Sequence, residues 1–309
     1  MTIDTILIST DGSDPAEAAA RRGFELAAQL GASVHLVSVA DVAIAASAGY
    51  AGDSARIRNR LREQAQTYVS RLEPAARERG LEVSTAVRDG IPGEELVEYA
   101  EELAVDAILI GTSGRGGVAR TVVGSVADKV IRTANVPVIA LTNDAADRED
   151  GSVGSILLPT DGSDAAEAAA DRGIDLATQL DVPVHLLFVA DEDVSGGLAS
   201  LLSDRDVDSV EELRKQGSDH LARVGTSARE QGVEFVAATR EGNPAEEIVD
   251  YAAENGIDMV VMGTHGRGGF ERFLIGSVTD RVIRTAPIPV MAVRSNGAQR
   301  KSNVTDVDE

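Results

Sequence analysis

The chain has 309 residues, of which 43% are hydrophobic and 26% charged, a composition typical of a folded globular protein and not of a disordered or membrane one. Its formal net charge of −22 opposes general binding to nucleic-acid phosphates or to an anionic membrane surface. The absence of cysteine excludes disulfides, thiolate metal sites and cysteine nucleophiles.

Short apolar runs alternate with longer amphipathic ones from the N-terminus onward, the pattern of β-α-β units in a parallel sheet. At the first helix, Asp14 is expected as the N-cap before Pro15, and Gly31 and Gly80 mark helix ends. The expected strands cover residues 3–8, 33–39, 82–87, 106–110 and 136–141, and the expected helices cover residues 14–30, 53–79, 92–103 and 125–134.

The whole pattern then occurs a second time. Residues 6–14, ILISTDGSD, return about 150 positions later as ILLPTDGSD at 156–164. Strands are therefore expected near Ile156, Val184, Phe235, Met259 and Val290. The predicted organisation is a first domain at 1–143, a polar linker at 144–153, a second domain at 154–294 and a disordered tail at 295–309.

A glycine-rich segment follows the fourth strand of each copy and leads into a helix. Glycines let the backbone approach an anion, and the amides at a helix N-terminus point toward it, so these segments are expected to bind phosphate. The alternative is that the glycines only turn the chain. The candidate residues are Gly111, Gly114, Gly124 and Ser125 in the first copy and Gly263, Gly266, Gly276 and Ser277 in the second.

An aspartate follows the first strand of each copy, Asp11 and Asp161, inside a Thr-Asp-Gly-Ser turn. Ligands of open parallel sheets bind beyond the carboxyl ends of the strands, so this turn should face the glycine segment if strands one and four are neighbours. The carboxylate would then contact a sugar hydroxyl or a cation bound to phosphate. Alternatively, the aspartate only forms the turn.

The four histidines show no metal-ligand spacing, and no dedicated metal site is expected. His35 and His185 occupy equivalent strand positions and are expected to be satisfied sheet residues. His265 lies in the second glycine segment, where it either contacts phosphate or is simply exposed. There is no P-loop, Rossmann fingerprint or nucleophile elbow, which argues against P-loop NTPase, hydride-transfer and acyl-transfer chemistry.

The acidic side chains are combined with only three lysines, and this composition looks like that of a cytoplasmic protein from a salt-accumulating halophile. An acidic mesophilic protein is the alternative. No apolar run approaches the roughly 18 residues of a membrane span, and the N-terminus lacks the features of a signal peptide. We therefore expect a cytoplasmic protein with neither nucleic acid nor membrane as a partner.

Together the glycine segments and the aspartate turns resemble the universal stress protein family, over both domains nearly from end to end. The resemblance implies an α/β fold like that of the adenine nucleotide alpha hydrolases, with two tandem open five-stranded parallel sheets of order 3-2-1-4-5 and helices on both faces. It implies that Asp11 and Asp161 contact ribose or the cation, that the backbone at Val39 and Val189 recognises adenine, and that the glycine and serine residues hold phosphates. Ser9 departs from the family's usual proline, which Pro159 retains.

The resemblance also implies pairing of the domains through their fifth strands, here within one chain, with larger homo-oligomers as a further option. The expected function is binding of ATP, ADP or AMP, with Mg²⁺ or Mn²⁺ arriving on the phosphates, in a stress-response or regulatory protein with two competent sites. A slow ATPase or nucleotide hydrolase is the alternative, although no base is evident beyond the turn aspartate. A second alternative is a protein-interaction module that binds no nucleotide and whose glycines are purely structural.

Overall fold

The computed structural model describes residues 2–43, 54–114, 123–148, 151–191, 206–266 and 275–294. The first half of the chain contains β1 (Thr5–Ser9), α1 (Asp14–Leu30), β2 (Ser33–Asp41), α3 (Ser54–Arg77), β3 (Val83–Gly90), α4 (Pro92–Glu102), β4 (Ala107–Gly111), α5 (Ser125–Thr133), β5 (Val138–Leu141) and α6 (Asn143–Ala146). The second half contains β6 (Ile156–Thr160), α7 (Asp164–Leu180), β7 (Val184–Ala190), α9 (Asp206–Glu230), β8 (Phe235–Glu241), α10 (Pro244–Glu254), β9 (Met259–Gly263), α11 (Ser277–Thr285) and β10 (Val290–Val293). The alternation of strands and helices predicted from the apolar pattern is confirmed.

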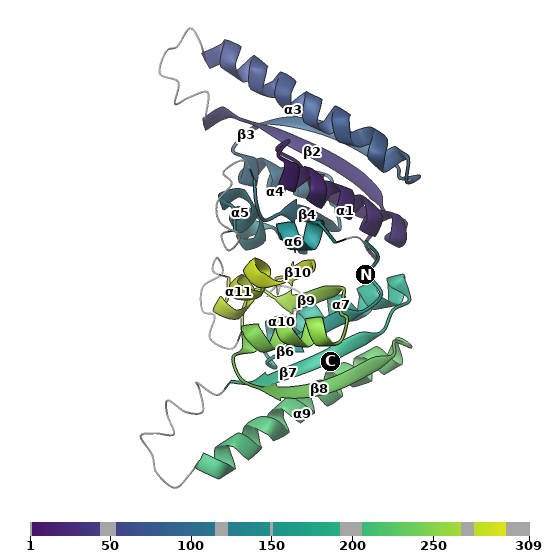
Figure 1. Cartoon of the computed structure of the whole chain (residues 1–309), viewed down its shortest axis with the longest axis vertical. Coiled ribbons are helices and arrows are strands. Elements are labelled where there is room, and N and C mark those ends of the chain that lie inside the picture. The colour runs from purple at the N-terminus through teal and green to yellow at the C-terminus, as the bar shows by residue number, and fades with distance from the viewer. Residues whose placement is uncertain are drawn as a thin grey trace, which may run out of the picture.

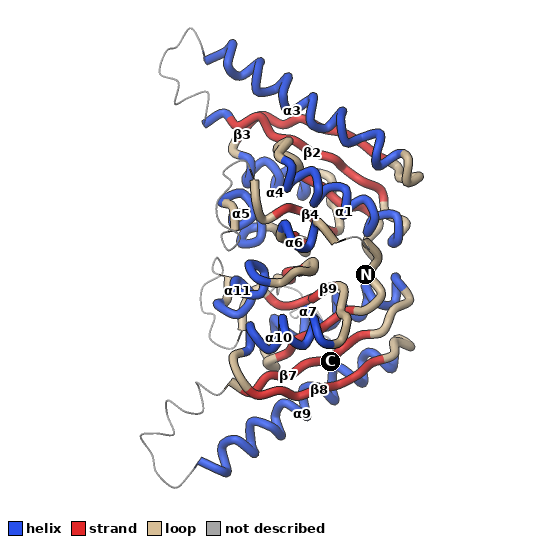
Figure 2. The backbone as a smooth tube through the Cα atoms, viewed as in Figure 1, coloured by secondary structure: helices blue, strands red, loops and turns tan. Residues whose placement is uncertain are grey.

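The ten strands within the described ranges form one sheet, in the order β3-β2-β1-β4-β5-β10-β9-β6-β7-β8 (Figures 1 and 2). Each half has the predicted order 3-2-1-4-5, and its strands are parallel. The two fifth strands pair antiparallel at the centre, where Met291 lies opposite Ile139. The predicted joining of the halves is therefore present, and it leaves β3 and β8 as the outer edges of the sheet.

The helices cover both faces of this sheet, and each face has its own apolar core. On one face α1, α3, α7 and α9 pack over side chains such as Ile6, Ile139 and Met291. On the other face α4, α5, α10 and α11 pack over alternate residues such as Leu7. Because successive residues of a strand point to opposite faces, both cores run through the central strand pair without a break. The halves consequently share two continuous cores.

Reciprocal hydrogen bonds tie the halves together at the ends of the central seam. The Gln29 side chain bonds the backbone N–H and C=O of Val153, at 2.9 and 2.7 Å. Gln179, its equivalent, bonds the N–H and C=O of Ile3 at 2.8 and 3.0 Å. Each half thus holds the segment that leads into the first strand of the other, as in a symmetric dimer.

One local expectation was wrong, and the expected linker contains some regular structure. The helix α6 extends into the linker expected at 144–153, where Ala145 and Val153 are buried. The N-cap of α1 is Ser13 and not Asp14, because the Ser13 hydroxyl accepts a hydrogen bond from the Ala16 N–H. Pro15 still lies in the first turn, where a missing N–H costs nothing. The predicted tail at 295–309 lies outside the described residues.

His35 and His185 are satisfied sheet residues, as predicted. Their Nδ1 atoms lie 3.4 and 2.9 Å from the hydroxyl oxygens of Tyr99 and Tyr251. Burial lowers the pKa of both histidines below the ordinary value. A guanidinium group lies over each tyrosine ring, that of Arg88 in the first half and that of Arg240 in the second. The same half-buried cluster of histidine, tyrosine and arginine therefore occurs once in each half.

These histidines predict a pH dependence of folding. As the pH falls below the ordinary histidine pKa of about 6.5, the unfolded chain takes up protons that the folded protein resists, so folding stability is lost. The double substitution His35→Gln and His185→Gln should remove this contribution. Thermal unfolding between pH 7.5 and pH 5 should show the wild type losing stability relative to the double variant. Parallel curves would contradict the prediction.

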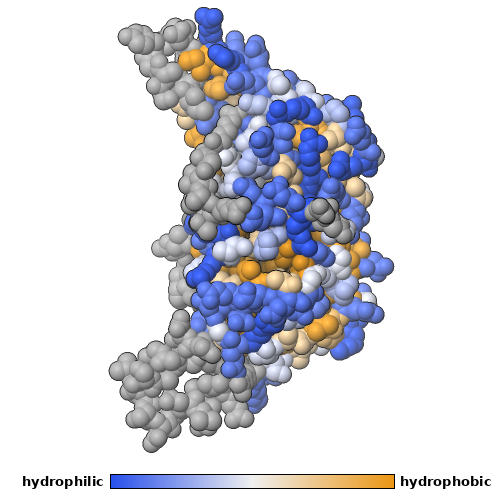
Figure 3. All heavy atoms as spheres, in the orientation of Figure 1, coloured by the Kyte–Doolittle hydropathy of each residue, from blue (hydrophilic) through white to orange (hydrophobic). Residues whose placement is uncertain are grey.

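On the face drawn in Figure 3, hydrophilic side chains cover most of the surface, and apolar side chains emerge mainly in the band between the two halves. Within the described ranges, no helix combines the length and apolar character needed to cross a membrane.

Candidate functional site

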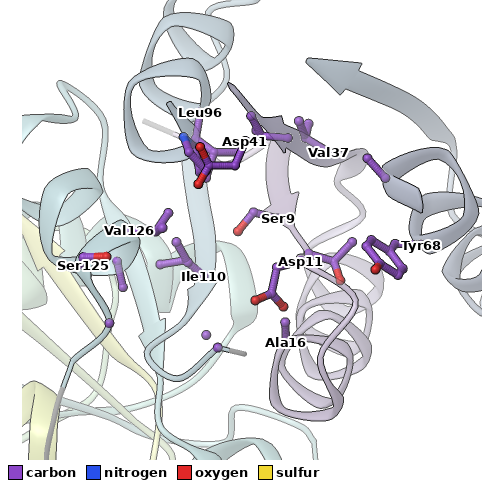
Figure 4. A pocket seen from close by; sticks show the side chains of 18 of the residues that line it. Ser9, Asp11, Ala16, Val37, Asp41, Tyr68, Leu96, Ile110, Ser125 and Val126 are labelled. Atoms are coloured by element: carbon purple, nitrogen blue, oxygen red, sulfur yellow. The ribbon is translucent and has the colours of Figure 1, made fainter. Parts of the chain in front are cut away.

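A cavity of about 390 Å³ opens at the carboxyl ends of the strands in the first half (Figure 4). Its walls come from the turn after β1, the end of β2, one face of α3, the start of α4 and the two ends of the glycine segment. Of the residues predicted for this half, the lining includes Asp11, Val39, Gly111, Gly114, Gly124 and Ser125. The structure therefore brings together all the described candidates of the first copy.

The turn after β1 is held by its own side chains. Asp11 Oδ1 accepts hydrogen bonds from the N–H and the hydroxyl of Ser13, at 3.0 and 2.6 Å. The Thr10 hydroxyl oxygen accepts from the N–H of Gly12 at 3.1 Å. Gly12 itself has φ +77°, a conformation that side chains other than glycine's rarely adopt. These contacts fix the position of the carboxylate at the cavity wall.

Asp11 faces the glycine segment, as the strand order requires. β1 is paired with β4, so the turn after one strand lies beside the segment after the other. A Cβ atom added to Gly114 would lie 2.9 Å from Asp11 Oδ2. In the second half, a Cβ atom added to Gly266 would lie 2.7 Å from Asp161 Oδ2. A side chain at either glycine would therefore force the carboxylate of the aspartate to shift.

The other two glycines of the segment have structural roles of their own. A Cβ atom at Gly111 would lie 3.2 Å from Ala19 Cβ, so this glycine lets α1 pack closely on β4. The N–H of Gly124 donates to the Thr112 carbonyl at 2.7 Å and closes the segment on itself. The N–H of Gly124, a residue predicted to hold phosphate, is therefore engaged within the segment itself.

The N-terminus of α5 supplies the remaining donors. Gly124 is its N-cap and makes no capping hydrogen bond through a side chain. The first residues of the helix, Ser125 and Val126, line the cavity. Backbone N–H groups of an uncapped first turn, together with the helix dipole, favour an anion. This end of the cavity is therefore suited to phosphate.

The wall provided by α3 was not predicted. Leu61, Gln64, Ala65 and Tyr68 line the cavity, and their spacing of three, four and seven residues places them on one face of the helix. The Tyr68 ring packs against Gly12, where a Cβ atom would lie 2.2 Å from the ring. The 61/64/65/68 pattern was visible in the sequence, but it is equally typical of an ordinary core-facing helix.

The second half repeats the arrangement. Asp161 Oδ1 accepts from the N–H of Ser163 at 2.9 Å, and Gly276 N–H donates to the Thr264 carbonyl at 2.7 Å. Val189 occupies the β7 position that corresponds to Val39, paired with β8. Gly263 lies against α7, where a Cβ atom would be 2.7 Å from the Ala165 carbonyl oxygen. Ser277 is the first residue of α11, and the N-cap Gly276 makes no side-chain cap.

The cavity therefore has two chemically distinct ends. Val37, Val39 and Leu96 give it an apolar end that suits a flat ring system, and the α5 N-terminus gives it an end for an anion. Asp11 lies between them and can accept hydrogen bonds or contact a cation. Within the described ranges, no three acidic or histidine side chains gather as a metal-binding group. Arg115, Arg120, Arg267 and Arg272, which flank the glycine segments, lie outside those ranges.

Comparison with known proteins gives a consistent result. A family model described as the universal stress protein family matches residues 2–141 and 153–294. A universal stress protein of Methanocaldococcus jannaschii is 40% identical over 139 residues, covering 45% of this chain and 81% of that protein. One of Mycolicibacterium smegmatis is 29% identical over 238 residues, covering 75% of each.

The fold has a solved counterpart of the same length. A crystal structure of a universal stress protein from Archaeoglobus fulgidus superposes with a TM-score of 0.70 at 18% identity, covering 95% of this chain and 97% of that one. At that identity the likeness concerns the fold alone.

Proposed function

The chain belongs to the universal stress protein family, and we propose that it is a stress-response or regulatory protein that binds one adenine nucleotide in each half. The observation that carries the proposal is the two-ended cavity, with an apolar end at Val39 and an uncapped helix N-terminus at Ser125. A base attached to a phosphate chain has the same two chemical ends. The volume of about 390 Å³ lies within the range of roughly 300–1,000 Å³ typical of small-molecule sites.

The aspartate makes a divalent cation part of the proposal. Asp11 Oδ2 lies against Gly114, at the entrance to the phosphate end, where a phosphate chain and a carboxylate would repel each other. Mg²⁺ or Mn²⁺ bound to the phosphates would remove this repulsion, since such ions are commonly held by one carboxylate and phosphate oxygens. We therefore expect nucleotide binding to weaken when the cation is chelated, and Asp11→Asn with Asp161→Asn to reduce that dependence.

The decisive experiment counts the ligands. Protein denatured after purification is examined by mass spectrometry for released adenine nucleotide, and stripped protein is titrated calorimetrically with ATP and Mg²⁺. We expect two nucleotides per chain. The double substitution Gly114→Val and Gly266→Val should abolish binding, because each added side chain collides with an aspartate that lines the site.

Each single glycine substitution serves as the control for the other. Gly114→Val should leave one nucleotide per chain, and so should Gly266→Val. Absence of any released nucleotide, together with no heat for ATP, ADP or AMP, would overturn the proposal. It would leave the glycine segments as structural elements of the fold.

A further inference from the structure

The lining of the two sites differs in only a few polar positions. The residues of the second half that correspond to the cavity lining are mostly identical or exchange one apolar side chain for another. Two of the polar differences bring histidine into the second site. His265 stands where the first site has Ser113, and His220 stands where it has Tyr68. The first site therefore offers hydroxyl groups where the second offers imidazoles.

His265 has one ring nitrogen satisfied and one that is not. Its Nδ1 lies 2.8 Å from the hydroxyl oxygen of Thr264, and the Thr264 side chain is buried. When that hydroxyl donates to Nδ1, the neutral imidazole carries its proton on Nε2. The Nε2 atom is buried and has no hydrogen-bond partner among the described residues. A buried donor without an acceptor costs free energy and calls for an explanation.

The position of His265 indicates what kind of acceptor it meets. A Cβ atom added to Gly276, the N-cap of α11, would lie 3.7 Å from His265 Cα and 3.8 Å from the Gly266 N–H nitrogen. The histidine thus borders the uncapped helix N-terminus at which a phosphate is expected. Asp161 Oδ2 lies against Gly266, the residue that follows His265. Rotation of the imidazole toward the α11 N-terminus would give Nε2 an anionic oxygen as its acceptor.

The second imidazole strengthens the contrast between the sites. His220 packs against Gly162 just as Tyr68 packs against Gly12. Its Nδ1 is contacted by the guanidinium of Arg223, which also forms an ion pair with Glu167 at 3.0 Å. A guanidinium can only donate, so Nδ1 accepts and Nε2 carries the proton. The same wall position carries a phenol ring in the first site and an imidazole ring in the second.

We propose that the two sites are unequal and that the second, through His265 Nε2, selects ligands with a longer phosphate chain. This inference rests on the proposed function and adds a division of labour to it. In the first site the Ser113 hydroxyl stands in place of this imidazole, so its affinity changes less from AMP to ATP. The second site adds an imidazole donor to a charged oxygen, and this kind of bond is worth roughly tenfold or more in affinity.

The test uses full-length chains with one site closed. Gly114→Val leaves the second site open, and Gly266→Val leaves the first. Calorimetric affinities for ATP, ADP and AMP with Mg²⁺ should show a steeper gain per phosphate at the second site. His265→Ser added to Gly114→Val should reduce the ATP affinity by roughly tenfold and leave AMP binding less affected. The reciprocal change, Ser113→His added to Gly266→Val, should raise the affinity of the first site for ATP.

A spectroscopic measurement separates this inference from the proposed function. The chain has four histidines, so the imidazole nitrogen resonances can be assigned by comparing the wild type with His265→Ser. Inorganic triphosphate is then added to the intact protein. A shift of the His265 Nε2 resonance supports phosphate contact even if no adenine nucleotide binds. Equal phosphate preference at the two sites, or an unmoved Nε2 resonance at saturating triphosphate, would overturn the inference.

Discussion

The substitution Ile139→Asp is expected to abolish folding of the entire chain, and not only of its first half. Ile139 is completely buried and lies opposite Met291 where the two fifth strands pair. An unpaired carboxylate at this position would lose its hydration without gaining a partner, a cost of several kcal/mol or more. Because proteins are stable by only about 5–15 kcal/mol, one such change is enough to unfold a domain.

The whole chain should respond because the central strand pair is shared. The core that contains Ile139 continues through Met291 into the second half. The reciprocal bonds of Gln29 and Gln179 would also be lost if either half unfolded. Circular dichroism and calorimetry should show no cooperative transition for Ile139→Asp. The milder Ile139→Ala should lower the unfolding free energy by roughly 2–5 kcal/mol in a single transition.

Val236→Asp is the matched control. Val236 lies in β8 at the outer edge of the sheet, and 52% of its surface is exposed. The same new charge should change the stability there by no more than about 0.5 kcal/mol. If Ile139→Asp instead gave a protein whose second half melts as in the wild type, the two halves would be independent units and the shared core would not couple them.

The strand order and the pairing of the fifth strands were expected from the resemblance to the universal stress protein family. The internal repeat showed that the runs 136–141 and 288–293 are equivalent, and the resemblance made each of them the fifth strand of its copy. Two apolar edges in one chain have an obvious way to be covered, by pairing with each other. The approach of Asp11 to Gly114 followed from the neighbouring positions of β1 and β4.

Other features depend on tertiary contacts that no local pattern contains. α6 is a single turn, Asn-Asp-Ala-Ala, held by the burial of Ala145 and by the Thr142 hydroxyl, which accepts from the Ala145 N–H. Ser13 caps α1 because its hydroxyl, and not the Asp14 carboxylate, points to the free N–H groups. The hydrogen bond from the Gly124 N–H to the Thr112 carbonyl also depends on the folded segment and is not indicated by the glycine pattern.

The wall formed by α3 is the largest part of the candidate site that the sequence did not predict. Its residues satisfy the pattern of a core-facing helix, and the pattern does not tell whether that face meets other side chains or a cavity. Whether this face meets a cavity depends on how far α3 extends beyond the carboxyl ends of the strands. That extent is set by helix packing and not by the sequence of the helix. Tyr68 enters the site for this reason alone.

Substitution of Gly12 is expected to have a large effect on both stability and binding. Gly12 has a positive φ and packs against the Tyr68 ring of the cavity wall. Gly12 and Gly31 have nearly the same backbone conformation, with φ +77° and +69°. A Cβ atom costs about 1 kcal/mol or slightly more in this conformation, so Gly31→Ala, which meets nothing within 4 Å, measures that cost alone. At Gly12 the added atom would lie 2.2 Å from the Tyr68 ring, and the ring has to move.

Gly12→Ala should therefore destabilise the protein clearly more than Gly31→Ala, and it should also change binding, because the displaced ring is a wall of the first cavity. Calorimetric titration should give about one nucleotide per chain for Gly12→Ala and two for Gly31→Ala. Adding Tyr68→Ala to Gly12→Ala should recover part of the lost stability by removing the collision. Equal destabilisation by the two glycine substitutions, with both sites still occupied, would mean that Tyr68 is free to leave the wall and takes no part in shaping the site.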